Sequence, residues 1–374
     1  MKKIGILTIH RIYNHGSFLQ AFALKTTIEN ILSDGTKCEL MDWPIKEGQS
    51  FPFYEKCNIN VPKPYGLKFW LHKKMKHATY CRDIAMAWQY QRLGELYIAQ
   101  CQKYLGVSEI PNYRCCYDLV VVGSDESFNC TQDDAVWDAL YCFNLRAQYI
   151  ISYACSFGYS TLKRLHDYKV LNMVKEGLHH YKELSVRDDN SRDIVYALTD
   201  RTALIHLDPV LVFDYSDYMP NIRRKKDFIL VYNYLNRIND SNFIQQIRAL
   251  AKREGLKIIS VFEYCPWADE NLAMTSFEVL SYFKKAKYVI TDTFHGTVMS
   301  IKFNKRFVVF VRESNFNKLY YLLQKFGLEN QIIKPEDNPL DKLFGDINWD
   351  AVNERLALES ERTKDYLRTI LKNI

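Results

Sequence analysis

The sequence lacks any run of about 18 consecutive apolar residues, so it contains no transmembrane helix of the usual length. It also lacks the marks of a secretory signal. The apolar run at residues 3–9 is short and is followed at once by His10 and Arg11, without a small-residue cleavage site. We interpret this run as the first strand of the fold, and these absences predict a cytoplasmic protein.

Metal-binding patterns are absent as well. The ten cysteines form no C-x-x-C pair, and no cluster of histidine and cysteine has the spacing of a zinc site. Reduced, buried thiols are therefore the economical interpretation of all ten, in agreement with a cytoplasmic location. We expect neither a metal nor a bound cofactor.

Two classes of partner are disfavoured by the same reasoning. No G-x-G-x-x-G motif follows the first predicted strand, so the fingerprint of a dinucleotide site is missing. The formal net charge is only +6 over 374 residues, which is too small for a nucleic-acid-binding surface. An anionic small substrate or an anionic membrane surface is enough to explain this mild basic excess.

The sequence does contain an alternation of apolar strands and amphipathic helices, in two series that meet near residues 212–227. The alternation is typical of an α/β fold with two Rossmann-like domains facing a cleft. Ser17 can cap the first helix. Strands are predicted at 3–9, 37–43, 117–123, 148–154, 202–211, 228–234, 256–262, 287–292 and 306–311, and helices at 18–32, 161–181, 242–255, 275–286 and 349–373.

In such sheets ligands bind beyond the carboxyl ends of the strands, so the loops at those ends are the candidate sites. In the first loop Asn14, Gly16 and Ser17 offer donors at a helix N-terminus to an anion or a sugar hydroxyl, unless they form an ordinary turn. In a second loop Ser124 and Asp125 follow a strongly apolar strand. Asp125 can accept a hydroxyl proton there, and the alternative is an Asx turn.

Two further loops carry a cation or a titratable group. Arg187 emerges at a strand end, where it can grip a carboxylate or phosphate, or alternatively form a surface ion pair with Asp188 or Asp193. His295 lies at the start of a helix, within a polar break at residues 291–297. Its imidazole can donate a hydrogen bond or a proton, although an isolated histidine is more often structural.

Six segments occur together in an order that resembles one family. The segments are MKKIGILTIHRIYNHGSFLQAFAL, YDLVVVGSDESFN, ISYACSFG, LSVRDDNS, HLDPVLVFD and YVITDTFHGTVMSIKFNKRFVVF. Over about residues 3–310 the chain is similar to the polysaccharide pyruvyl transferases. The resemblance implies a GT-B-like fold, phosphoenolpyruvate as donor, and an acceptor sugar with two suitably placed hydroxyls. The expected product is a pyruvate ketal, such as a 4,6-ketal on galactose, made on a lipid-linked oligosaccharide or polysaccharide precursor in capsular or exopolysaccharide biosynthesis.

The resemblance also implies roles for individual residues. His295 would be the general acid or a phosphate ligand, Arg187 would hold the donor, and Asp125 is the candidate base on the acceptor side. Thr293 stands where several family members carry an arginine. Arg312 or Lys302, or backbone amides and threonine hydroxyls, would then hold the phosphate. The expected donor contacts are Arg187, Thr293, Phe294, His295, Gly296, Thr297 and Arg312, and the expected acceptor contacts are Asn14, Gly16, Ser17, Ser124 and Asp125.

On this basis we predict an N-terminal domain of residues 1–220 on the acceptor side and a C-terminal domain of residues 221–345 on the donor side. The final helix, within 346–374, is expected to pack back on the first domain. Residues 44–105 form a basic, aromatic insertion, whose segment 63–82 either lies on an anionic membrane leaflet or is a solvated helix face. The alternative functions are a nucleotide-sugar glycosyltransferase and a non-catalytic glycan-binding protein.

Overall fold

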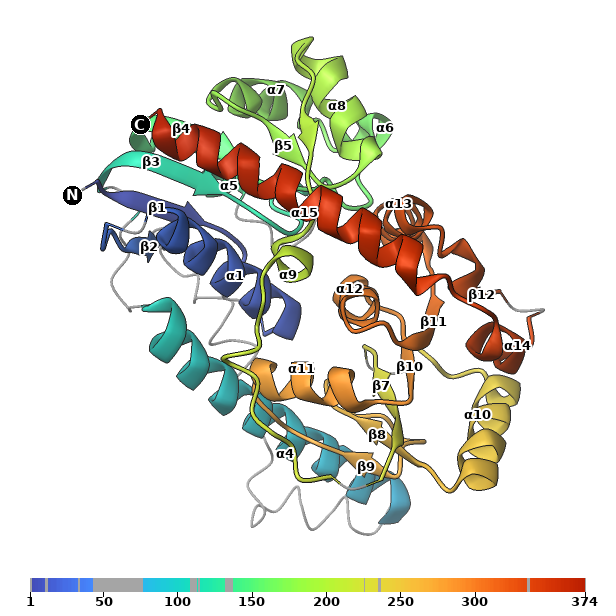
Figure 1. The fold of residues 1–374 in the computed structure, drawn as a ribbon. Helices are drawn as coiled ribbons and strands as arrows, with labels where there is room; N and C mark the ends of the chain where they lie inside the picture. Colours follow the sequence, from blue (N-terminus) through green and yellow to red (C-terminus); the bar gives the residue numbers. More distant parts are fainter. Residues whose placement is uncertain are drawn as a thin grey trace.

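Two parallel β-sheets, each flanked by helices, form the framework of the protein (Figure 1). The computed structural model describes residues 2–10, 13–32, 34–42, 77–107, 113, 115–131, 137–224, 226–234, 237–334 and 337–373, and only the backbone of residues 77–83 and 137–138. Most of the basic segment predicted at 63–82 therefore lies outside the described residues.

The first sheet is built from the apolar segments predicted as strands. Its four parallel strands have the order β2-β1-β3-β4. All of β1 and the last four residues of β3 are buried, as in parallel sheets covered on both faces. The strands are β1 (Ile4–Leu7), β2 (Cys38–Leu40), β3 (Cys116–Val122) and β4 (Arg146–Ser152).

A short two-stranded sheet, β5 (Ser185–Val186) with β6 (Leu204–Ile205), continues beyond β4 through a bridge between Cys155 and Val186. The strand predicted at 202–211 is thus wrong beyond Ile205. The physical reason is a helix start, because Asp208 caps α9 (Pro209–Val212) by accepting the backbone N–H of Val210.

The second sheet has six parallel strands in the order β12-β11-β10-β7-β8-β9. Its central strands are again those of the predicted apolar runs, so the expected α/β fold is confirmed. The strands are β7 (Phe228–Tyr232), β8 (Lys257–Ser260), β9 (Glu270–Asn271), β10 (Tyr288–Thr291), β11 (Arg306–Phe310) and β12 (Ile332–Ile333).

The helices follow the strands in the predicted alternation, with two corrections. The helix predicted at 161–181 is divided, because Lys169 adopts a left-handed φ of 59°. The first helix begins before Ser17, because Asn14 already accepts the N–H of Gly16. The helices are α1 (His15–Leu32), α4 (His77–Gln100), η1 (Cys101–Leu105), α5 (Trp137–Leu140), α6 (Leu162–Asp167), α7 (Leu171–His179), α8 (Asp189–Thr199), α9, α10 (Ser241–Glu254), α11 (Ser276–Lys285), α12 (Phe294–Lys302), η2 (Glu313–Asn315), α13 (Phe316–Phe326), η3 (Glu329–Gln331), α14 (Pro339–Phe344) and α15 (Trp349–Lys372).

Apolar contacts hold the two halves together between the sheets. One continuous cluster of buried side chains includes β1 and α1 from the first half and β7, α11 and α12 from the second. Within it the rings of Phe22 and Phe277 lie 5.1 Å apart, edge to face. This packing holds α1 against α11.

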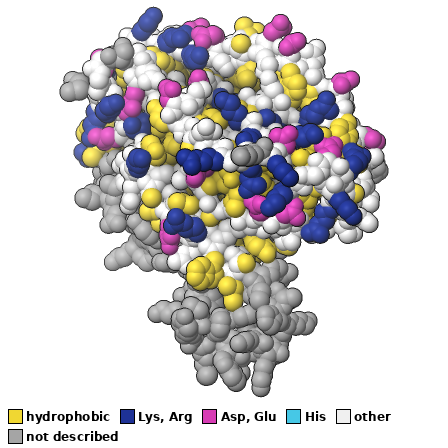
Figure 2. All heavy atoms as spheres, turned by 60° about the horizontal axis from the view of Figure 1, so that its bottom comes forward, with side chains coloured by type: hydrophobic (Ala, Val, Ile, Leu, Met, Phe, Trp, Pro, Cys, Tyr) yellow, Lys and Arg dark blue, Asp and Glu magenta, His cyan; other side chains and the backbone are white. Residues whose placement is uncertain are grey.

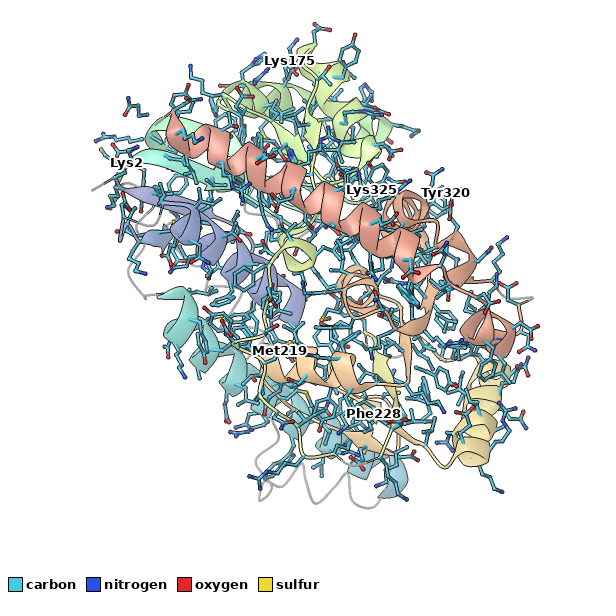
Figure 3. All side chains as sticks on the ribbon, in the orientation of Figure 1. Lys2, Lys175, Met219, Phe228, Tyr320 and Lys325 are labelled. Atoms are coloured by element: carbon cyan, nitrogen blue, oxygen red, sulfur yellow. The ribbon has the colours of Figure 1, made fainter. Side chains whose placement is uncertain are left out.

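The long C-terminal helix α15 runs across both halves (Figure 1). The Tyr366 hydroxyl donates to the carbonyl of Ser152 in the first half, at 3.0 Å. In the second half Lys325 of α13 points toward α15 (Figure 3), where its Nζ lies 2.9 Å from a Glu359 carboxylate oxygen. The helix therefore ties the halves together, whereas the predicted domain boundary at residue 220 stays a prediction.

The molecular surface is mixed in charge. On the face shown in Figure 2, lysine and arginine side chains alternate with acidic and apolar ones over the described residues. Within the described residues, no helix is both long and apolar enough to span a bilayer.

Candidate active site

Two helix N-termini, one from each half, meet at the centre of the molecule. Helix α1 follows β1, and α12 follows β10. A Cβ atom added to Gly16 would lie 2.0 Å from Nδ1 of His295, so only glycine allows this approach. The predicted loops around residues 14–17 and 291–297 are therefore neighbours, and both helix ends point their partial positive charge into the same region.

A pocket of about 640 Å³ opens beside these helix ends. Among the predicted site residues it is lined by Asn14, Ser17, Asp125, Thr293, Phe294, His295 and Arg312. The remaining lining residues are Ile9, Tyr13, Tyr90, Gly94, Glu126, Tyr159, Tyr232, Tyr234, Arg237, Phe262, Glu263, Asp292, Ser314, Asn315 and Lys318. We call this space the central pocket.

Five predicted site residues do not line the central pocket. They are Gly16, Ser124, Arg187, Gly296 and Thr297, and all five are buried. Ser124, for example, donates both its N–H and its hydroxyl to Oε1 of Gln20, at 2.9 and 3.1 Å. Their binding roles stay predictions.

Thr293, rather than Asp292, caps helix α12. Its hydroxyl accepts the N–H of Gly296 at 2.8 Å. A Cβ on Gly296 would come within 2.1 Å of Thr291 Oγ1, so this first turn also requires glycine. The hydroxyl of Thr297 donates to the Thr293 carbonyl at 3.0 Å. The threonines of the motif thus build the helix end.

Behind the pocket wall lies a buried group of charges. Arg187 donates to Asp208 at 2.9 Å and to Asp125 at 3.1 Å, and its guanidinium carbon lies 4.1 Å from the centre of the Phe294 ring. The alternative of a surface ion pair with Asp188 or Asp193 is wrong, because the Arg187 side chain is only 2% exposed and its partners are other carboxylates.

His295 joins this group through Asp208. Its Nε2 lies 3.4 Å from an Asp208 carboxylate oxygen, without the geometry of a hydrogen bond. Burial raises the pKa of Asp208, but the neighbouring His295 and Arg187 outweigh burial and hold it below its usual value. Sequence reasoning missed Asp208, which had been interpreted only as the end of a strand.

Asp125 is an ionised carboxylate in this setting. Burial raises its pKa, but Arg187, His295 and Lys318 act in the opposite direction and bring it to about 2. Its backbone has a φ of 69°, a conformation that costs free energy for a residue other than glycine and that clusters at functional sites. The hydroxyl of Ser17 donates to its second oxygen at 3.1 Å.

The pKa of Asp292 is shifted in the opposite direction to that of Asp125. One of its oxygens accepts the N–H of Tyr234 at 3.0 Å, and the other has no hydrogen-bond partner. The Nη2 of Arg312 lies 3.7 Å from that second oxygen. Burial raises the pKa of Asp292 to about 6, although Tyr234, Arg312 and Arg237 oppose the shift. Sequence reasoning had weighed Asp292 only as a helix cap.

The sequence matches the family model named polysaccharide pyruvyl transferase over residues 14–314. The chain belongs to this family. No curated protein matches the sequence.

Solved structures with a similar fold are distant in sequence. MnaA of S. aureus in complex with UDP shares 12% identity at a TM-score of 0.50, with 100% of this chain and 98% of that chain covered. The UDP-GlcNAc 2-epimerase of Neisseria meningitidis bound to UDP-GlcNAc shares 9% identity at a TM-score of 0.50, with coverage of 100% and 99%. These likenesses confirm the expected GT-B fold of this pyruvyl transferase family member.

In this pyruvyl transferase family member, Arg312 lines the central pocket. It is one of the two cations that we considered as a replacement for the arginine that several family members carry at the position of Thr293. Its N–H donates to the side chain of Asn315, which in turn donates to the Asp292 carbonyl at 2.9 Å. The alternative, Lys302, points elsewhere, because its Nζ donates to the carbonyls of Leu211 and Phe213. Arg312 is therefore the better placed of the two cations that the sequence offered.

Two more cations of the pocket were missed by sequence reasoning. Lys318 pairs with Glu126 across the two halves. Arg237 is exposed and lies over the Tyr234 ring, 4.3 Å from its centre. No sequence signal marks Lys318, because its partner Glu126 is 192 residues away. Among the described residues, no group of three or more His, Cys, Asp or Glu side chains could hold a metal ion.

Aromatic side chains form a further part of the pocket lining, which we call the aromatic wall. Its rings belong to Tyr13, Tyr90, Tyr159, Tyr234 and Phe262. Asn14 connects the wall to α1 by donating to the Tyr234 hydroxyl at 2.9 Å. Aromatic faces with hydroxyl groups suit a ligand that is apolar on one face and rich in hydroxyls at its edge, as a sugar ring is.

Proposed function

We propose that this protein transfers the enolpyruvyl group of phosphoenolpyruvate onto two hydroxyls of an acceptor sugar and releases phosphate. The proposal is carried by one observation, namely that a member of the polysaccharide pyruvyl transferase family has a pocket lined by helix N-termini, by cations and by aromatic rings. The helix ends and cations suit a carboxylate and a phosphate, and the aromatic rings suit a sugar.

The donor site would lie between the N-terminus of α12 and the cations Arg312, Arg237 and Lys318. Backbone N–H groups at a helix N-terminus bind anions without a side-chain charge, which would compensate for the threonine at position 293. His295 would contact the phosphate. Arg187 and Asp208 would act from behind, by holding the Phe294 ring and the imidazole in place.

The acceptor site would lie along the aromatic wall, with Asn14 and Ser17 contacting sugar hydroxyls. We infer a hexose with two such hydroxyls, for example a galactose that becomes a 4,6-ketal, carried on a polyprenyl diphosphate at the inner face of the cell membrane. The basic segment 63–82 would then contact anionic lipid.

The test is incubation of the protein with phosphoenolpyruvate and a panel of free and lipid-linked oligosaccharides. The expected result is acceptor-dependent phosphate release, together with a product heavier by one pyruvate minus one water in mass spectrometry. Consumption of a nucleotide sugar instead would show a glycosyltransferase. Acceptor binding without turnover, unchanged in His295→Ala, would show a glycan-binding protein. Turnover of lipid-linked acceptors only would support the membrane location.

A further inference from the structure

Asp292 has a feature that neither the capping role nor the expected donor contacts explain. It lines the central pocket, yet its side chain is completely buried and one carboxyl oxygen, Oδ2, has no hydrogen-bond partner. Buried polar atoms are almost always hydrogen-bonded, so an unpaired one needs an explanation. An atom that exchanges a proton with a ligand is such an explanation.

The surroundings of Asp292 favour the protonated form. Burial is the largest effect and raises its pKa, the Tyr234 N–H, Arg312 and Arg237 lower it, and Glu263 raises it slightly, so that the pKa lies at about 6. A bound donor would bring a carboxylate and a phosphate into the same space. Like charges disfavour ionisation, so the bound anion would raise the pKa of Asp292 toward neutrality. An acid is most effective when its pKa lies near the working pH.

Three other carboxyl groups in or near the pocket are less suited to the task. Asp125 is held at a pKa of about 2 and is already bonded to Arg187 and Ser17. Glu126 pairs with Lys318. Asp208 lies outside the lining of the pocket and contacts Arg187 and His295. Of the carboxyl groups compared, only Asp292 combines an unpaired oxygen with a raised pKa.

We propose that Asp292 is the general acid that protonates the methylene carbon of the enolpyruvyl group. This inference rests on the proposed function. Oδ2 gives its proton to the methylene carbon, the C=C electron pair forms the new C–H bond, and the neighbouring carbon becomes an oxocarbenium centre. His295 is then left to contact the phosphate.

With Asp292 as the acid, the protons and bonds of the remaining steps are all accounted for. One sugar hydroxyl attacks the oxocarbenium carbon, and its proton returns to the Asp292 carboxylate. Phosphate leaves with the C–O bonding pair, the second hydroxyl closes the ketal ring, and its proton leaves with the phosphate. Asp292 thus ends as it began, and the methyl group of the ketal contains one hydrogen that came from an exchangeable proton.

The experiment compares wild type with Asp292→Asn. Asparagine keeps an oxygen for the Tyr234 N–H but carries no transferable proton. We expect kcat for phosphate release to fall about 10²–10⁴-fold, the usual contribution of a general acid, while calorimetric binding of phosphoenolpyruvate is retained. Asp214→Asn is the matched control, because Asp214 only makes an exposed turn with Ser216 and should leave kcat unchanged.

A measurement on the wild-type protein guards against poor folding of the variant. A general acid must be protonated, so the wild-type kcat should decrease as pH rises through the pKa of Asp292, and a flat profile between about pH 5 and 8 contradicts the proposal. Wild-type kcat in Asp292→Asn also contradicts it, while the proposed function stands. A wild-type protein that neither binds nor consumes phosphoenolpyruvate overturns both.

Discussion

Replacing Gly16 by alanine should disable the site without unfolding the protein. The added Cβ would lie 2.0 Å from Nδ1, 2.1 Å from Cγ and 2.7 Å from Cβ of His295. Ordinary contact begins at 3.4 Å, so the two helix ends must separate by about 1.4 Å, the difference between 3.4 and 2.0. Rotation of the ring cannot relieve the contact with its Cβ, so the backbone has to move.

A displacement of about 1 Å in a catalytic arrangement costs on the order of 100-fold in rate. We therefore expect kcat/KM for acceptor-dependent phosphate release to fall by about that factor in Gly16→Ala. Alanine raises helix propensity by up to about 1 kcal/mol, which partly offsets the clash in the thermal unfolding measurement. Gly345→Ala is the control, since its Cβ would find its nearest neighbour at 3.3 Å. Wild-type kcat/KM in Gly16→Ala would refute the reasoning.

Three further changes test the charges and the cap behind the pocket. Arg187→Met leaves the carboxylates of Asp125 and Asp208 buried without their cation, and should lower the free energy of unfolding by about 3–5 kcal/mol in urea titrations; a loss under about 1 kcal/mol would contradict the buried network. The depressed pKa of Asp125, about 2 against 3.8, stabilises the fold above pH 3.8, and about 2 kcal/mol of this is lost as pH falls toward 2. This acid slope, measured by urea titration at several pH values, should be missing in Asp125→Asn. Thr293→Val removes the acceptor for the Gly296 N–H and should cost about 1 kcal/mol. An unchanged unfolding midpoint would show that the cap does not matter.

The central strands of both sheets could be predicted from the sequence, because buried parallel strands appear in it as continuous apolar runs. At the start of α11 the sequence offers Thr275 or Ser276 as the cap, and the structure has Thr275 in a capping box with Glu278. Sequence reasoning failed at the start of α1, because Asn14 and Ser17 are equally good caps and only the backbone geometry selects Asn14. Local pattern therefore predicts an element more reliably than its first residue.

The residues of the central pocket were also predicted only in part, because local pattern does not show contacts between distant segments. Loops at strand ends contribute to the central pocket, so the predicted residues Asp125 and His295 both line it, while their roles stay predictions. Asp208 and Lys318 were not found, since their significance depends on partners far away in the chain. Lys318 pairs with Glu126 across 192 residues, and no periodicity encodes such a contact.

The threonine at position 293 shows that a position can have a structural role where the family pattern leads us to expect an arginine. In this protein the position serves as the cap of α12, and its hydroxyl accepts the Gly296 N–H. An arginine would lose that cap but add a charge. Arg312 is our candidate for that charge, because it follows the neighbouring strand β11 and is held through Asn315 beside Asp292. Because adjacent parallel strands end at the same edge of a sheet, a cation after β11 can reach the region that one after β10 would occupy. The departure from the family pattern is therefore compatible with a donor site at the end of α12.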